Sequence, residues 1–234
     1  MSEWWTYHLS DFLLFSSRTY HRLFEIYNAA IWPAQVLAVL LGLATLALSR
    51  RAAGARARTI AAMLAACWLW IAIAFLAARY ATINWAAVYF AWAFGLEAAL
   101  MVWIGVIRGS LAFEWPGGVA GRIGLGILLF ALAVEPCVGL LLRREWRGVE
   151  IFGVAPDPTA VATLGILLLT RGRGRGLLMV IPAIWCAVTG LTLMAMKAPD
   201  AWIPPLVAAL TIALSILQRR GNSAKRTPDG QMVR

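Results

Sequence analysis

Three acidic residues lie within stretches that otherwise read as membrane hydrocarbon. Glu97 occurs in AFGLEAALM, Glu135 in LAVEPCVGLLL and Asp157 in VAPDPTAV. A charged side chain at the centre of a bilayer costs roughly 3 kcal/mol on insertion scales, so such a residue usually faces a bundle interior, finds a partner or stays protonated. Acids gathered inside a membrane can bind a cation or pass protons. These three residues are therefore the first candidates for chemistry.

The composition indicates an integral membrane protein. Of the 234 residues, 62% are hydrophobic and only 14% are charged, and the mean hydropathy is +0.76. The net charge of +10 comes from short basic blocks between apolar runs, the arrangement that sets orientation in a bilayer. The expected partner is therefore the lipid bilayer and not nucleic acid.

Seven apolar runs are long enough to cross roughly 30 Å of hydrocarbon as helices. None alternates with a period of two, so strands are not expected. We predict an all-α, polytopic transmembrane helical bundle with about seven spans, at residues 30–49, 59–78, 86–107, 123–142, 151–170, 177–196 and 202–218.

The Lys and Arg residues predict the orientation of these spans. With the C-terminus inside, the inner segments hold fourteen of the 21 basic residues and the outer segments hold seven. The positive-inside rule then predicts an N-out, C-in topology. RGRGRG at 171–176 is interpreted as a tight basic turn on the inner side, because no strand precedes it as one does in a phosphate-binding loop.

The chain divides into three predicted regions. Residues 1–28 form an interfacial amphipathic segment, residues 29–218 the transmembrane bundle, and residues 219–234 a basic, flexible cytoplasmic tail. In the first region Ser16 can cap a helix with an apolar stripe. The stripe either lies in the outer membrane interface, with Trp4 and Trp5 as anchors, or packs on the bundle; its members are Tyr20, Leu23, Phe24, Tyr27 and Ile31.

The three acids are predicted to lie at similar depths. Counted from the inner ends of their spans, Glu97 lies roughly 15 Å deep, Glu135 roughly 18 Å and Asp157 roughly 20 Å. Pro156 and Pro158 forbid a continuous fifth helix, so we expect a half-helix that begins near Pro158 with Asp157 as its N-cap. In transporters, a broken helix at this depth commonly marks the binding site.

Pro136 adds a second helix break beside Glu135. It removes an intrahelical hydrogen bond and leaves the carbonyl of Leu132 without its usual donor, so a kink is expected. Together these features predict a polar cavity that opens outward and is lined by Glu97, Glu135 and Asp157. Such a cavity can hold a cation, water or a polar solute.

A structural interpretation of the same acids remains open. Glu97 can hydrogen-bond across helices in its protonated form, and Asp157 can serve only as a helix cap. Glu135 is within side-chain reach of Arg143 or Arg144.

No metal, cofactor or enzymatic activity is expected. The soft side chains within spans, which suit Cu(I), show no spacing typical of a metal site; they are Cys67, Met101, Cys137, Met179 and Cys186. The chain has no H-E-x-x-H or G-x-S-x-G motif, and no catalytic residue is predicted.

Several stretches resemble a family of small bacterial multi-pass membrane proteins known as a domain of unknown function, some of whose members carry the loose label of permease. The stretches are YNAAIWPAQ (27–35), INWAA (83–87), RGSLAF (108–113), EPCVGLLL (135–142), FGVAPDPT (152–159) and VIPAIW (180–185). The resemblance covers nearly the whole chain and implies a bacterial inner membrane protein, but no binding residues.

The acids depart from the pattern of this family. There, the position of Asp157 is usually a cysteine and that of Glu135 is usually an aromatic residue. The resemblance therefore favours the Pro-x-Pro break itself, together with Asn84, Glu97 and the backbone around Gly153, as site candidates.

Two functions remain on these grounds. The first is a permease or transporter for a small polar solute or cation, proton-linked through Glu97 and Glu135. The alternative is a non-transporting membrane subunit or scaffold that packs against a partner membrane protein or a second copy of itself.

Overall fold

The computed structural model describes residues 15–50, 54–113, 118–142 and 145–224, with side chains up to residue 218 in the last helix. These residues are helical apart from turns and one short strand pair, which confirms the all-α class. The predictions that concern Trp4, Trp5, Arg143, Arg144 and residues 225–234 lie outside this part of the chain.

The described chain begins with two helices that meet at a right angle. Helix α1 (Ser17–Ala30) and helix α2 (Ala34–Ser49) differ in direction by 92°. The Ser16 side chain accepts a hydrogen bond from the Thr19 N–H at 3.2 Å, which confirms the expected cap.

The aromatic stripe of α1 packs on the bundle. Phe24 and Tyr27 are each 1% exposed, and their ring centroids lie 4.8 and 5.1 Å from that of Phe75. Of the two alternatives for this stripe, the structure has the packed one.

Four helices within the described ranges are long and apolar enough to cross a membrane, and the bent α1–α2 pair can count as a fifth. Three of them contain π-helical turns. The four are α3 (Ala55–Trp70) with η3 (Ile71–Ala77) and η4 (Tyr80–Thr82); α4 (Ala87–Met101) with η5 (Val102–Ile107); α5 (Gly118–Leu129) with η6 (Phe130–Val134) and α6 (Glu135–Leu141); and α8 (Arg175–Leu178) with α9 (Val180–Ala195).

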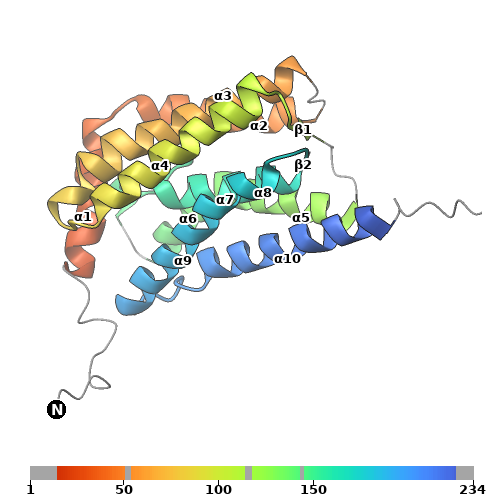
Figure 1. Ribbon diagram of the computed structural model, residues 1–234. Coiled ribbons are helices and arrows are strands. Elements are labelled where there is room, and N and C mark those ends of the chain that lie inside the picture. Colours follow the sequence, from red (N-terminus) through yellow and green to blue (C-terminus); the bar gives the residue numbers. More distant parts are fainter. Residues whose placement is uncertain (1–14, 51–53, 114–117, 143–144, 225–234) are drawn as a thin grey trace, which may run out of the picture.

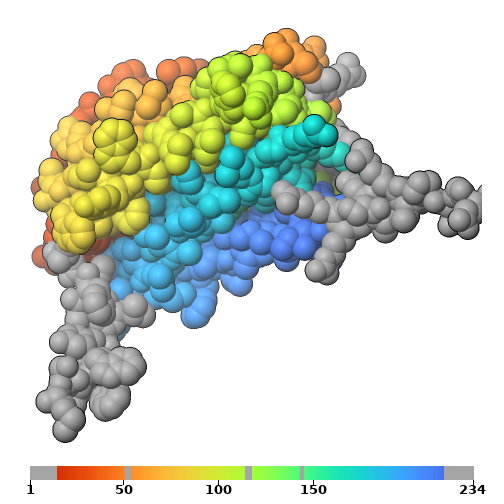
Figure 2. All heavy atoms as spheres, viewed as in Figure 1, coloured from red at the N-terminus to blue at the C-terminus, as the bar shows by residue number. Residues whose placement is uncertain are grey.

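The last helix, α10 (Ile203–Ala224), has a shorter apolar part, Ile203–Gln218, and continues six residues past the predicted end of the seventh span. The helices as a whole fit a multi-pass membrane protein, while the count of seven spans stays a prediction. Figure 2 shows α4 (yellow to green), α9 and α10 (both blue) side by side on one face.

Helix α7 (Pro156–Leu168) is the centre of the bundle (Figure 1). Every residue from 152 to 170 is buried, and α7 packs against α5, α9 and α10. Its 13 residues span about 20 Å, less than the roughly 30 Å of a hydrocarbon core. Irregular backbone at the ends of so short a helix is tolerated at membrane depth only where protein or water surrounds it.

Polar side chains satisfy the backbone just before α7. The Tyr27 hydroxyl donates to the carbonyl of Val154 at 2.9 Å. The Gly153 N–H donates to Thr159 Oγ1 at 2.7 Å, and the Thr159 hydroxyl donates to the carbonyl of Ala155, also at 2.7 Å. These bonds meet the need of buried backbone groups for partners, so the irregular segment is stable without water.

Arg175 holds the opposite end of α7. One of its guanidinium nitrogens lies 2.8 Å from both the carbonyl of Thr170 and Oε1 of Gln218, and the other donates to Oγ of Ser215 at 2.8 Å. Bonds from a charged donor are roughly twice as strong as neutral ones. Arg175 therefore fastens the end of α7 to α10.

The two connections at this end of the bundle are also joined to each other. Strand β1 (Ala112–Phe113) pairs antiparallel with strand β2 (Thr170–Arg171). Figure 1 places this pair at the end of the bundle away from α1.

Helices α5 and α7 cross at two glycines. A Cβ added to Gly124 would lie 2.7 Å from the carbonyl oxygen of Gly165, and one added to Gly165 would lie 2.7 Å from that of Gly124. Small residues at a crossing allow two backbones to approach closely, which is the main source of helix association in a membrane.

We expect Gly124→Ala to destabilise the protein by about 1–3 kcal/mol, because the new methyl group would force the two backbones apart. Gly126→Ala is the matched control on the same helix, since nothing lies within 4 Å of an added Cβ there. Thermal unfolding of both variants in detergent measures the difference. Equal midpoints would contradict the glycine crossing.

Candidate functional site

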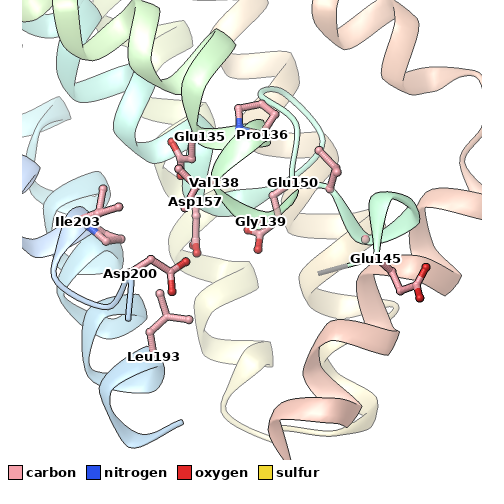
Figure 3. Close-up of a pocket in the computed structure, with 13 residues that line it drawn as sticks. Glu135, Pro136, Val138, Gly139, Glu145, Glu150, Asp157, Leu193, Asp200 and Ile203 are labelled. Carbon is pink, nitrogen blue, oxygen red and sulfur yellow. The ribbon is translucent and has the colours of Figure 1, made fainter. Parts of the chain in front are cut away.

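An acidic pocket lies at the α1 end of the bundle, where the start of α7 meets α6, α9, α10 and the loop containing η7 (Trp146–Gly148) (Figure 3). Its volume is about 50 Å³, room for a few water molecules or a small cation. Among the described residues that line it, five are acidic and none is basic; the acids are Glu135, Glu145, Glu150, Asp157 and Asp200.

Asp157 is anchored to α9 by two hydrogen bonds. Trp185 Nε1 donates to Oδ1 of Asp157 at 2.7 Å, and the Thr189 hydroxyl donates to the same oxygen at 2.8 Å. All three residues are buried. The carboxylate therefore belongs both to the pocket lining and to the joint between α7 and α9.

The predicted start of this helix needs correction. Helix α7 begins at Pro156, two residues before the expected Pro158, and Ala155 takes the N-cap position that Asp157 was expected to hold. Proline suits the first turn because the N–H groups there have no intrahelical acceptor. Asp157 lies in this first turn, where the helix dipole favours a negative charge.

Glu135 lies at the first position of α6, directly after the π-helical turn η6 and before Pro136. The span 118–141 is continuous, and η6 takes the place of the expected kink; π turns are frequent at functional sites. Oε2 of Glu135 is buried and has no hydrogen-bond partner among the described residues.

The acids of the pocket interact electrostatically. Glu135 lies close enough to Asp157, Glu150 and Asp200 to experience the charge of each, and Figure 3 shows the four side chains gathered while Glu145 points away. Like charges in a poorly solvated site repel one another, so a bound cation or proton relieves the repulsion. The arrangement thus suits a positively charged ligand.

Glu97 does not line the acidic pocket. It is fully buried on α4, and neither of its carboxyl oxygens has a hydrogen-bond partner among the described residues. Phe94, one turn earlier on α4, packs against Trp185 with ring centroids 5.0 Å apart, and Phe90 does so at 5.4 Å. The aromatic cluster of Trp185, Phe90 and Phe94 therefore links the level of Asp157 to that of Glu97.

Asn84 and Gly153 also lie outside the pocket lining. Asn84 Oδ1 accepts a hydrogen bond from the Ala86 N–H at 3.0 Å, in the turn before α4. Gly153 has a φ of +85°, which favours glycine, and an added Cβ would lie 3.2 Å from Cys67 Sγ and 3.3 Å from Ala38 Cβ. Both residues shape turns, and Gly153 lets the segment before α7 approach α2 and α3.

Five residues of the site were missed by sequence reasoning. Glu145, Glu150 and Asp200 lie in connections between helices, where an acid usually faces solvent. Trp185 and Thr189 lie within an apolar run, four residues apart and hence on one face of α9. That spacing was the available signal, but it does not reveal which partner the face meets.

Metal ligation is not evident at the pocket. Among the described residues, no group of three or more His, Cys, Asp or Glu side chains is arranged to hold a metal ion.

Comparison with known proteins identifies the family. A model described as a family of unknown function, DUF6064, matches residues 17–226. The chain belongs to DUF6064. No curated protein and no solved structure matches it. The match covers all the described helices up to α10, including every described residue of the acidic pocket, so the site lies within the DUF6064 fold.

We expect Thr189→Val to lower the free energy of unfolding by about 1.5–3 kcal/mol, because it removes a hydrogen bond to a charged acceptor. Thr192→Val is the matched control on α9, where the hydroxyl donates to the carbonyl of Val188 at 2.9 Å; its loss should cost less than about 1 kcal/mol because that carbonyl is part of the helix ladder. Unfolding in detergent measures both. Thr189→Val is also made in the Asp157→Ala background. If it lowers the free energy of unfolding there by as much as in the wild type, the loss does not come from the bond to Asp157.

Proposed function

We propose that this protein is a permease of the bacterial inner membrane that moves a small polar solute, in particular a small cation, through the acidic pocket. The observation that carries the proposal is the unpartnered Oε2 of Glu135 within a pocket lined by four further acids. A buried carboxyl oxygen without a partner is costly to maintain, and acids within membrane spans usually mark functional sites.

The size and charge of the pocket limit the solute. A volume of about 50 Å³ admits a small ion with a few waters or a methylammonium-sized group, but not a sugar or nucleotide. Among the described lining residues five are acidic and none is basic, so the preferred solute carries positive charge.

The broken fifth segment supports transport over a passive role. The first turn of α7 contributes Asp157 to the lining of the pocket, and the backbone before this helix is irregular yet buried. Transporters commonly build their solute sites at discontinuous helices inside the bundle. In this proposal, the start of α7 is the element that responds when the pocket is filled.

Glu97 supplies the proton linkage. It lies one turn past Phe94 on α4, outside the lining of the acidic pocket and without a hydrogen-bond partner among the described residues. Acids at successive levels of a bundle form the proton relays of pumps and transporters. Glu135 would exchange cation and proton at the pocket, and Glu97 would carry the proton further.

We expect Glu135→Gln to reduce cation uptake into liposomes at least tenfold, with and without a pH gradient, because the pocket loses the negative charge of the acid whose Oε2 has no partner among the described residues. Glu97→Gln should remove only the uptake that a pH gradient drives. Tracer uptake of sodium and methylammonium, measured together with proton flux, tests both. Glu25→Gln is the control, since Glu25 pairs with Arg22 at 3.7 Å outside the acidic pocket. Wild-type flux in both Glu135→Gln and Glu97→Gln would contradict the transport proposal.

The scaffold alternative has one observation in its favour. Helix α4 and the turn before it expose a row of large side chains, namely Trp85 in the turn and Tyr89, Trp92 and Leu96 on the helix, which are 55–77% exposed. Tryptophan normally concentrates at the membrane interfaces, and Trp92 lies about 8 Å past the start of α4. A constant partner that co-purifies with the protein, and that Trp92→Ala releases, would favour the scaffold.

A further inference from the structure

We propose that a basic pocket at the β1–β2 end of the bundle binds the headgroup of an anionic phospholipid. The pocket has a volume of about 500 Å³, tenfold that of the acidic pocket, and lies between η5 and α8. The residues that define it are Trp103, Arg108, Ser110, Arg173 and Leu177.

Two separate loops are fastened together to form this pocket. Ser110 Oγ lies 3.0 Å from the carbonyl of Arg173 and 3.0 Å from that of Ile104. Gly172, with a φ of +140°, lies against the carbonyl of Ser110 so closely that no Cβ fits. The β1–β2 pair continues the join. The stretches RGSLAF and RGRGRG are thus held in contact, and Arg108 and Arg173 line one pocket.

The charge of the pocket matches a phosphate group. Arg108 and Arg173 are exposed, and none of the described lining residues is acidic. The Arg108 guanidinium lies over the Trp103 ring, 5.1 Å from its centroid. Arg58 adds a third guanidinium nearby, because a Cβ at Gly109 would lie 2.8 Å from its Nε. Guanidinium groups bind phosphate oxygens in a two-pronged geometry.

The walls of the pocket indicate a lipid and not a soluble phosphate. Trp103 and Leu177, which line the pocket with the arginines, are 49% and 51% exposed, and Ile107, next to Arg108 in the chain, is 60% exposed. The acyl chains of a bound lipid would contact these apolar side chains. Basic pockets between transmembrane helices on the cytoplasmic side suit anionic headgroups, and tryptophan favours the headgroup level.

Native mass spectrometry of the purified full-length protein, titrated with phosphatidylglycerol or phosphatidylcholine, tests the proposal. We expect one tightly bound phosphatidylglycerol per chain and markedly weaker binding of phosphatidylcholine. Each basic residue near an anionic headgroup contributes roughly fivefold in affinity, so Arg108→Gln with Arg173→Gln should weaken phosphatidylglycerol binding about 30-fold. Arg108→Lys with Arg173→Lys keeps the charge and should stay within about fivefold of wild type.

Arg147→Gln is the matched control, because Arg147 also lies over a tryptophan ring, 5.5 Å from the centroid of Trp146, but at the acidic-pocket end. It should bind phosphatidylglycerol like wild type. Three results would overturn the proposal: unchanged affinity in the glutamine double variant, equal loss in the lysine double variant, or glycerol phosphate binding as tightly as the whole lipid. The last result would assign the pocket to a soluble phosphate.

Discussion

The architecture depends on a helix that is too short to cross a membrane by itself. Helix α7 spans about 20 Å, and the backbone on either side of it is not helical, so lipid contact would leave peptide groups unpaired at a cost of several kcal/mol each. Other helices must therefore enclose it entirely. The close glycine crossing with α5 and the side-chain hydrogen bonds at both ends follow from this requirement.

The enclosure also explains where the two pockets lie. Because α7 stops short of both ends of the bundle, the space beyond each end is filled by connections and not by helix. At the α1 end these connections carry Glu145, Glu150 and Asp200, and they meet Glu135 and Asp157. At the other end they carry arginines and are joined by β1 and β2. The acids of one set of connections and the arginines of the other thus line two pockets of opposite charge.

Helix caps and helix breaks were predictable from the sequence. Which helices pack beside one another was not. The cap at Ser16 and the break at the two prolines depend on neighbouring residues, which periodicity and proline geometry reveal. Glu97 was placed at the depth of Glu135, but its lateral position depends on which helices are neighbours. That arrangement results from packing, and it puts the aromatic cluster between Glu97 and Asp157.

The missed residues show the same limit. Trp185 and Thr189 have a function in this site only because α9 packs beside the start of α7, a contact that no local pattern encodes. Likewise, Gly153 and Asn84 were predicted as site candidates, but both lie outside the pocket lining: Asn84 is bonded within its own turn and Gly153 to Thr159 in α7.

The hydrogen bonds at the two ends of α7 differ in kind. A ligand in the acidic pocket would therefore affect the attachment of the two ends differently. Arg175 contributes three bonds at one end, each from a charged donor to a neutral acceptor that no pocket ligand would reach. At the other end, Trp185 and Thr189 donate to Oδ1 of Asp157, whose strength as an acceptor depends on its own charge. A cation bound beside Glu135 would also attract the Asp157 carboxylate. Oδ1 of Asp157 would then be a weaker acceptor, and both hydrogen bonds would weaken. The pocket end of α7 would then be held less tightly to α9, while Arg175 holds the opposite end in place.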